Sequence, residues 1–519
     1  MRPNVLLITA DQWRGDCLGV AGHSVVRTPN IDRLAARGTF FARHFAQAAP
    51  CGPSRASLYT GLYQMNHRVV RNGTPLDRRH DTIALAMARL GYRPVLFGFT
   101  DQAVDPRTVP ADSPWLRTYE GILPGFDVGV RIPENPEPWL AWLEQRGHER
   151  PANFWDIYRP IGEPVAGPSN APPCYGADET ETAFLADAFL DWLGGRPAGE
   201  PWFAHVSFLS PHPPFIVPAP FNRLYDPAGG PPFRRAESAA TDAASHPFVA
   251  YWHNITTTAS RFFTPDPTAA ATPIADFSDA DFRTIRAVYW GMVAEVDSQV
   301  GRILAGLETV GAAPDTVIVL TSDHGEMLGD HWTLGKFGYF DQSFHVPLII
   351  ADPRRKSGGR IEVFSEAVDV MPTIIELAGG AAPGHLDGCS LVPFVDRRHP
   401  ASWRDVAHWE YDFREVETGA AQSFLGLDLD ACMLAVIRGE RFKYVHFAGL
   451  QPLLFDLRED PDELVDRADD PAYLGVRLEY AERMLAWRAR HLDRTLTGVL
   501  LTPSGPVDAR RRGEQVGTP

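Results

Sequence analysis

Short apolar segments that each end in a polar residue constrain the fold of this chain more than any other feature. Five of them are "NVLLITADQ", "RPVLFGFTD", "PWFAHVSFLSPHPPF", "DTVIVLTSDHGE" and "VPLIIAD". Short apolar runs of this kind are typical of parallel strands buried on both faces of a sheet. Helical stretches separate them, and strands that alternate with helices favour an open α/β sheet.

The polar residues that follow these strands are candidates for a ligand site, because such sheets bind ligands beyond the carboxyl ends of their strands. Each residue can also be no more than a strand end, and for Asp352 that interpretation is preferred. The remaining candidates are Asp11, Gln12, Asp101, His212, Asp323 and His324.

One long helix is predicted from about Asp279 to Leu307. Apolar residues recur there at spacings of three and four, as on the buried face of a helix. Ser278 lies three residues before Asp281, an arrangement typical of a helix start.

The character of the chain changes after about Ser390. "CMLAVIRGERFKYVHFAG" and "QPLLFDLREDPDE" predict two strands around turns, packed by a helix near "YLGVRLEYAERMLAWRARHL". We therefore expect a large α/β domain over residues 1–390, and a smaller C-terminal α+β subdomain with a tail over residues 391–519.

Residues 213–273 form a long excursion that is rich in Pro, Ala, Ser and Thr and has no sustained periodicity. Such a segment suits a lid over one face or a contact between copies of the chain. Together with the C-terminal arm, it predicts a homodimer or homotetramer.

The net charge of −16 argues against nucleic acid and acidic membranes as partners, because bulk repulsion opposes both. An anionic substrate would need a positive field built locally. The opening "MRPNVLLITADQWRGD" has only a short apolar run, so it predicts neither a secretory signal nor a membrane span. Five widely spaced cysteines without a CxxC pair fit a reducing, cytoplasmic location.

Two dyads, Asp11-Gln12 and Asp323-His324, should meet at one edge of the sheet. Two carboxylates in a largely dry cleft repel each other unless a cation lies between them. Oxygen ligands with one imidazole suit a single divalent ion, and the imidazole favours Mn²⁺ or a similar transition metal over Ca²⁺. The alternative is a pair of capped strand ends without a metal. His331 is interpreted as a structural histidine or one that supports the ligands.

The segment "APCGPSRASLYTG" places Cys51 in a turn that opens a helix. A bare thiol is most often an inert, buried small residue. Here Pro53 favours a helix start, so Cys51 should lie near free amide donors, and Arg55 one turn on can hold an anionic group. A thiolate nucleophile would need a partner base nearby in space.

The whole segment, Cys-Gly-Pro-Ser-Arg followed by "ASLYTG", resembles the C-x-P-S-R signature of the sulfatases, whose cysteine is oxidised after translation to formylglycine. The resemblance extends over nearly the whole chain, through "RTPNIDRLAARGTFF", "SPHPPF", "TSDHGEMLGDHWTLGK" and "DVMPTIIELAG". The chain looks like the sulfatase branch of the alkaline phosphatase superfamily, closest to the phosphonate monoester hydrolases and their arylsulfatase relatives.

The resemblance implies an alkaline-phosphatase-like fold, in which helices flank a central mixed sheet and a smaller C-terminal α+β subdomain follows. Residues 1–390 would then be the catalytic domain. One divalent metal would be bound by the two dyads together with the modified cysteine, that is by Asp11, Gln12, Cys51, Asp323 and His324.

For the substrate, the resemblance implies contacts with the anionic oxygens or the leaving group from Asn72, His212 and Lys336. Arg55 would orient the formylglycine. Each contact has a plainer alternative: a turn residue for Asn72, a loop histidine for His212 and a solvated charge for Lys336. A formylglycine-generating enzyme would be a partner during maturation.

Several positions depart from the common sulfatase pattern. Gln12 and His324 replace the Asp and Asn of many sulfatases and match the phosphonate monoester hydrolases, which also favours Mn²⁺. After the "VLFGF" strand, sulfatases usually place Lys and His, and the phosphonate hydrolases Tyr and Thr, whereas this chain has Phe99 and Asp101. The missing cation would weaken recognition of a doubly charged phosphate monoester and leave singly charged esters acceptable, with Asp101 close to the substrate.

The function expected first is formylglycine-dependent hydrolysis of sulfate monoesters, with activity on phosphonate monoesters and phosphodiesters. The alternative reverses these preferences, and a third hypothesis is a non-catalytic scaffold that binds a metal and an anion. In the catalytic hypotheses the aldehyde hydrate supplies the attacking oxygen and later expels the product. His212 or Lys336 would protonate the leaving alcohol.

Overall fold

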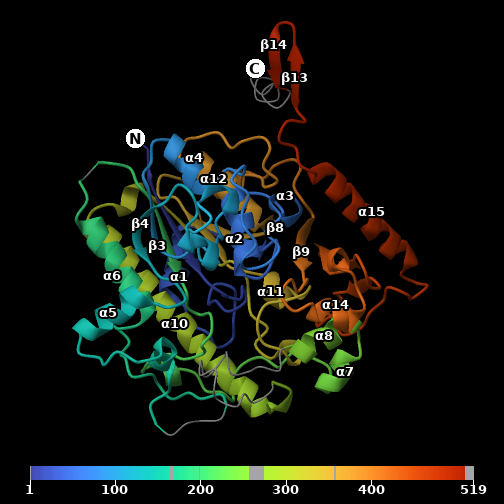
Figure 1. Cartoon of the computed structure of the whole chain (residues 1–519), viewed down its shortest axis with the longest axis horizontal. Helices are drawn as coiled ribbons and strands as arrows, with labels where there is room; N and C mark the ends of the chain where they lie inside the picture. Colours follow the sequence, from blue (N-terminus) through green and yellow to red (C-terminus); the bar gives the residue numbers. More distant parts are fainter. Residues whose placement is uncertain (1, 163–166, 198, 256–273, 356–357, 509–519) are drawn as a thin grey trace.

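The structure of this chain is a computed structural model that describes residues 2–162, 167–197, 199–255, 274–355 and 358–508. At its centre is an eight-stranded sheet with the order β4-β3-β5-β1-β6-β7-β2-β8 (Figure 1). Its strands are β1 (Asn4–Ala10), β2 (Thr39–Phe45), β3 (Pro94–Gly98), β4 (Asp127–Arg131), β5 (Phe203–Phe208), β6 (Thr316–Thr321), β7 (Leu348–Ala351) and β8 (Gly359–Glu366).

The sheet is mixed, as predicted. β1 pairs in parallel with β5 and β6, whereas β7 runs antiparallel to both β6 and β2. The expectation that "VPLIIAD" forms a parallel strand was therefore wrong. All four residues of β7 are buried. A strand in the middle of a sheet is apolar throughout because both its faces are covered, whichever way it runs.

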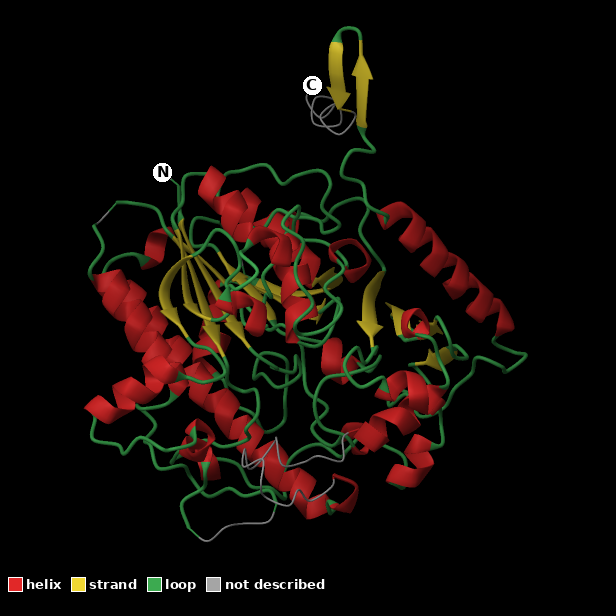
Figure 2. Cartoon of the chain, in the orientation of Figure 1, coloured by secondary structure: helices red, strands yellow, loops and turns green. Residues whose placement is uncertain are grey.

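Helices cover both faces of the sheet (Figure 2). Alternate side chains of β1 enter different cores, since Leu6 and Ile8 pack on one face and Val5 and Leu7 on the other. The first face is covered mainly by α1 (Pro29–Arg37), α5 (Glu137–Gln145), α6 (Glu181–Gly194) and α10 (Asp279–Thr309). The second is covered mainly by α2 (Cys51–Thr60), α4 (Ile83–Arg89), α12 (Val370–Leu377) and α13 (Val392–Val395).

The predicted long helix is confirmed as α10, which ends two residues beyond the expected Leu307. The Ser278 side chain accepts from the backbone N–H of Asp281, and the Asp281 carboxylate accepts from the N–H of Ser278. This reciprocal capping satisfies amide donors that the first helical turn leaves unpaired.

The C-terminal subdomain is also confirmed. It contains an antiparallel sheet in the order β12-β11-β10-β9, formed by β9 (Val406–Asp412), β10 (Met433–Gly439), β11 (Phe442–Phe447) and β12 (Leu453–Asp456). The segments expected to give two strands give three, because the turn at residues 440–441 divides "CMLAVIRGERFKYVHFAG" into β10 and β11. The predicted helix, α15 (Leu474–His491), packs on β10 and β11. The domain boundary at residue 390 stays a prediction.

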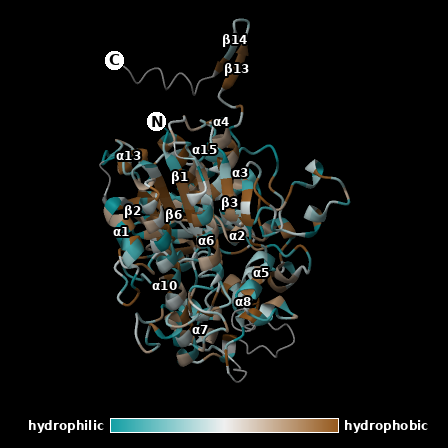
Figure 3. Ribbon diagram, turned by 90° about the vertical axis from the view of Figure 1, so that its left-hand side faces the viewer, coloured by the Kyte–Doolittle hydropathy of each residue, from teal (hydrophilic) through white to brown (hydrophobic). Residues whose placement is uncertain are grey.

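The hairpin of β13 (Val499–Thr502) and β14 (Gly505–Asp508) projects from the body of the molecule (Figures 1 and 3). It carries the exposed side chains of Leu500 and Leu501. The expected homodimer or homotetramer stays a prediction.

The Pro- and Ala-rich excursion includes the short helices α7 (Ala239–Ala243) and α8 (Pro247–Ile255), and residues 256–273 of it lie outside the described residues. The other short helices are α3 (Gln64–His67), α11 (Asp341–Phe344) and α14 (Ala420–Leu425). Among the described residues, no helix combines the length and hydropathy needed to cross a membrane.

Candidate active site

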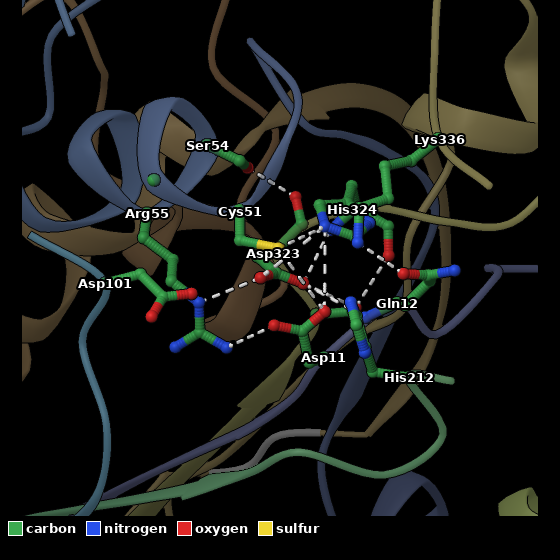
Figure 4. Close-up of polar contacts among 12 residues, drawn as sticks. Asp11, Gln12, Cys51, Ser54, Arg55, Asp101, His212, Asp323, His324 and Lys336 are labelled. Carbon is green, nitrogen blue, oxygen red and sulfur yellow. Dashed lines mark hydrogen bonds and ion pairs between the residues drawn. The ribbon is translucent and has the colours of Figure 1, made fainter. Parts of the chain in front are cut away.

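Four buried side chains gather at the carboxyl edge of the sheet (Figure 4). Each offers one ligand atom, and these atoms lie within 4.8 Å of one another. The ends of β1 and β6 meet there because the strands pair in parallel, with Thr9 beside Thr321. The four residues are Asp11 after β1, Cys51 at the start of α2, and Asp323 and His324 after β6.

Arg55, one turn into α2, joins the two carboxylates. Its Nε donates to Asp323 Oδ2 over 2.8 Å and its Nη2 to Asp11 Oδ2 over 3.1 Å. The Ser207 hydroxyl accepts from Nη1 at 2.9 Å, and the Phe99 ring lies 4.2 Å from the guanidinium carbon. Phe99 therefore packs on this arginine. The predicted role of Arg55 in orienting formylglycine stays a prediction.

The inner carboxylate oxygens face the other members of the cluster. Asp11 Oδ1 lies 3.6 Å from His324 Nε2 and 3.8 Å from Cys51 Sγ. Burial and the charge of Asp323 raise the pKa of Asp11 to about 6. Burial also tends to raise the pKa of Asp323, but His324 and Arg55 outweigh it and hold that pKa below its usual range. Arg55 alone does not balance the two acids, so the donor set fits a divalent cation.

The thiol of Cys51 is poorly suited to act as a plain nucleophile. Burial and the neighbouring Asp11 raise its pKa well above the ordinary value. A possible base is near, because His324 Nε2 lies 3.2 Å from Sγ, but burial lowers the pKa of that imidazole to about 4. A neutral histidine does little to stabilise a thiolate. These surroundings argue against direct use of the Cys51 sulfur as a nucleophile.

Gln12 lies beside the four-residue cluster with a left-handed backbone (φ 65°). Its N–H donates to Asp323 Oδ1 at 3.1 Å, its side-chain oxygen accepts from Lys336 Nζ at 2.5 Å, and its NH₂ donates to Glu326. Its predicted role as a ligand stays a prediction. Glu326, which the sequence did not single out, also accepts from the backbone N–H of Gly335 and so holds the loop that carries Lys336.

Lys336 and His212 lie on the Gln12 side of the cluster (Figure 4). Burial lowers the pKa of Lys336, but Cys51 and nearby carboxylates raise it more, so Lys336 stays charged. Burial and the charge of Lys336 lower the pKa of His212 to about 3. His212 Nδ1 lies 2.7 Å from the Pro213 carbonyl, which can only accept. The neutral ring therefore carries its proton on Nδ1 and has an acceptor at Nε2.

The other two predicted residues, Asn72 and Asp101, lie against the first turn of α2. Asn72 Oδ1 accepts from the N–H of Gly52 at 2.8 Å. A Cβ at Gly52 would lie 3.1 Å from that oxygen and 3.2 Å from the Asp101 carbonyl, so only glycine fits this approach comfortably. Asp101 has a left-handed backbone (φ 50°), and burial raises the pKa of its carboxyl group to about 7. Their predicted contacts with substrate stay predictions.

Of the two residues set aside as structural, Asp352 is bound by Arg354 and Arg355. His331 lies 3.3 Å through Nδ1 from Asp242 and stacks on Phe340. Neither is a member of the buried cluster.

Comparison with known proteins identifies the family. A family model described as Sulfatase matches residues 3–381. The chain belongs to the sulfatase family. A second model, described as N-sulphoglucosamine sulphohydrolase, C-terminal, matches residues 329–490. The predicted family and the predicted class of enzyme, a hydrolase, are thereby confirmed.

Three similar proteins span nearly the whole chain. The multifunctional alkaline phosphatase superfamily protein PehA of Trinickia caryophylli is 42% identical over 513 residues, 97% of this chain and 98% of its own. The crystal structure of the phosphonate monoester hydrolase of Agrobacterium radiobacter superposes with a TM-score of 0.94 at 52% identity, covering 98% of this chain and 99% of that one. An arylsulfatase of Clostridium perfringens is 28% identical over 498 residues, 93% of this chain and 94% of its own.

Proposed function

We propose that this sulfatase-family enzyme hydrolyses singly charged esters, with phosphonate monoesters and phosphodiesters preferred over sulfate monoesters. The observation that carries the proposal is the 52% identity to a phosphonate monoester hydrolase over nearly the full length of both chains. Gln12 and His324, which match the pattern of those enzymes, add support. The order of preference is the reverse of the one expected first from the sequence.

The charges of the site support a singly charged substrate. Arg55 is engaged by Asp11 and Asp323, which leaves Lys336 as the basic side chain facing the cluster among the residues labelled in Figure 4. Asp101, in the loop after β3 that packs against the start of α2, adds a buried acid. A second negative charge on the substrate would therefore meet no further basic side chain among these labelled residues.

The buried cluster fits one divalent ion, with Mn²⁺ favoured by the imidazole of His324 and Ca²⁺ as the alternative. Asp11, Asp323, His324 and the converted side chain at position 51 would hold it, with Gln12 beside them. When bound, the ion lowers the pKa of an oxygen ligand and withdraws negative charge from the substrate. A formylglycine-generating enzyme would supply the aldehyde at Cys51.

The chain's own groups would handle the leaving oxygen. Lys336 Nζ carries protons beside Gln12, whereas neutral His212 presents an acceptor at Nε2. We therefore assign protonation of the leaving alcohol to Lys336 and orientation of the reacting groups to His212.

Sulfate monoesters are the second candidate, favoured by the sulfatase family model and by the arylsulfatase relative. The third hypothesis is the scaffold that retains a thiol at position 51. The cytoplasmic location expected from the cysteines also stays a prediction, with the free, exposed Cys174 and Cys389 as its support.

The test compares a phenyl phosphonate monoester with an aryl sulfate that has the same leaving phenol. The enzyme is produced with a formylglycine-generating enzyme and loaded with Mn²⁺, and Cys51→Ala is the control. We expect kcat/KM to be at least about tenfold higher for the phosphonate, a difference of about 1.4 kcal/mol in the barrier. A higher value for the sulfate would overturn the preference. No hydrolysis of either ester would favour the scaffold.

A further inference from the structure

A cavity of about 50 Å³ lies next to the candidate active site. It is bordered by α5, α6, α10 and the loop after β5, and its volume is enough for a few water molecules or a compact ligand group. Its lining includes Trp139, Tyr158, Tyr175, Glu181, His212 and Glu295. His212 thus borders both this cavity and the buried cluster.

Two acids reach this cavity from different helices. Glu181 is 8% exposed and Glu295 is 1% exposed. Glu181 Oε1 is buried and has no hydrogen-bond partner. Glu295 Oε1 accepts from the Thr180 hydroxyl at 2.7 Å and from the Gln299 amide at 3.1 Å. Glu181 Oε2 accepts from the Tyr158 hydroxyl at 3.4 Å. An unpaired buried acceptor is costly, so Glu181 Oε1 calls for a positively charged or proton-donating partner.

No Lys or Arg is among the described residues that line the cavity, so a cationic partner does not come from its walls. Burial raises the pKa of Glu181 to about 8 and that of Glu295 to about 7, as expected for carboxylates without a counter-cation. A cationic ligand would offset this cost.

Aromatic rings form another part of the wall. The Trp139 ring centroid lies 5.7 Å from that of Tyr158 and 5.1 Å from that of Tyr175. Aromatic faces together with carboxylates attract an organic ammonium group, through cation–π and ionic attraction. A metal ion prefers a shell of oxygen ligands, and the aromatic part of the wall provides none, so a metal ion is the competing occupant that the experiment tests.

We propose that this cavity binds an ammonium group carried by the alcohol portion of the ester substrate. His212 borders the cavity on the side of the candidate leaving-group residues, so the alcohol of a bound ester would extend past His212 toward Glu181 and Glu295. The inference rests on the proposed function and names the class of substrate for the same site, an ester of an amino alcohol.

The experiment uses two methylphosphonate monoesters that differ in one atom of the alcohol. One is the ester of choline, and the other is the ester of 3,3-dimethylbutanol, in which carbon replaces the charged nitrogen. We expect kcat/KM to be at least about tenfold higher for the choline ester. Glu295→Gln and Glu181→Gln should each reduce this ratio severalfold while they leave kcat/KM for the neutral ester within about twofold. Glu308→Gln, on the exposed part of α10, is the matched control and should preserve the ratio.

A ratio near one in the unaltered enzyme, or a high ratio that both glutamine variants retain, would overturn the inference while the proposed function stands. Binding of tetramethylammonium, measured by calorimetry, separates the two ideas. If neither ester nor the phenyl phosphonate is hydrolysed, but tetramethylammonium binds and Glu295→Gln weakens it, the proposed function fails and the cavity's preference for ammonium is supported. Binding of K⁺ or Ca²⁺ at this site in place of tetramethylammonium would contradict it.

Discussion

Arg55 donates from Nε to Asp323 Oδ2 over 2.8 Å, and both side chains are fully buried. The same guanidinium reaches Asp11, so one residue of the C-x-P-S-R segment holds the ends of β1 and β6 together. This contact ties the helix that presents Cys51 to the two strands that present the acids. The geometry of the candidate metal site therefore depends on Arg55 as well as on the ligands.

Replacing Arg55 should destabilise the enzyme more than removing a surface charge would. Arg55→Leu leaves two buried acids without their cation, which costs about 3–5 kcal/mol. Arg55→Lys keeps the positive charge but lacks the planar fork that contacts both carboxylates. Because the charge is kept, this variant should lose less free energy of unfolding than Arg55→Leu. The midpoint of urea denaturation should be highest for wild type, lower for Arg55→Lys and lowest for Arg55→Leu. A Leu variant as stable as wild type would show that the contact contributes little.

Removal of the metal should abolish activity and lower stability together. Without a metal ion, Asp11 and Asp323 face each other, and Arg55 and Lys336 compensate their charges only in part. A chelator should therefore remove one ion per chain, as measured by elemental analysis, and reduce the thermal midpoint, and Mn²⁺ should restore both properties. Asp323→Asn should bind the ion at least about tenfold more weakly. Full activity in metal-free protein would rule out the metal site.

The acids of the ammonium cavity should make stability depend on pH. The pKa values of Glu181 and Glu295 are raised from 4.5 to about 8 and about 7, so the folded state keeps protons that the unfolded state releases. Their contribution to stability is therefore fully present below about pH 4.5 and is lost as the pH rises through the folded values. Glu295→Gln should reduce this loss by at most about 3 kcal/mol. The midpoints of urea denaturation of wild type and Glu295→Gln, measured at pH 5 and pH 8, check this prediction. If the midpoint falls equally in the two proteins between these pH values, the prediction is contradicted.

Asp101→Asn should broaden the accepted charge of the substrate. The buried carboxyl group at position 101 opposes a second negative charge nearby, and asparagine tolerates the left-handed backbone found there. We expect kcat/KM for a doubly charged phosphate monoester to rise severalfold relative to that for a phosphonate monoester. If Asp101→Asn leaves the ratio of these two kcat/KM values unchanged, Asp101 does not face the substrate.

The strand ends could be predicted from the sequence because each apolar run stops at the residue that enters the site. Asp11 and Asp323 were found in this way, and the parallel pairing of β1 and β6 brings them together. Cys51 was found through the family signature that surrounds it. The direction of β7 was not predictable, since its buried residues are apolar in either direction.

Other residues carry no local signal of their role. Glu326 supports Gln12 and the Lys336 loop through contacts that depend on how two distant segments fold against each other. Glu181 and Glu295 are acids at buried positions of two helices more than 100 residues apart, and only the packing of α6 on α10 places them on one cavity. Sequence periodicity reports which face of a helix is buried, but not which buried polar residues share a cavity.

The central claim is that the side chain at position 51 acts as formylglycine and not as a thiol. The most direct measurement is the mass of the peptide that contains Cys51, taken from enzyme produced with and without a formylglycine-generating enzyme and compared with the specific activity of each sample. The account predicts that activity rises in proportion to the fraction of peptide carrying the aldehyde. A fully active sample whose peptide contains only unmodified cysteine would contradict it.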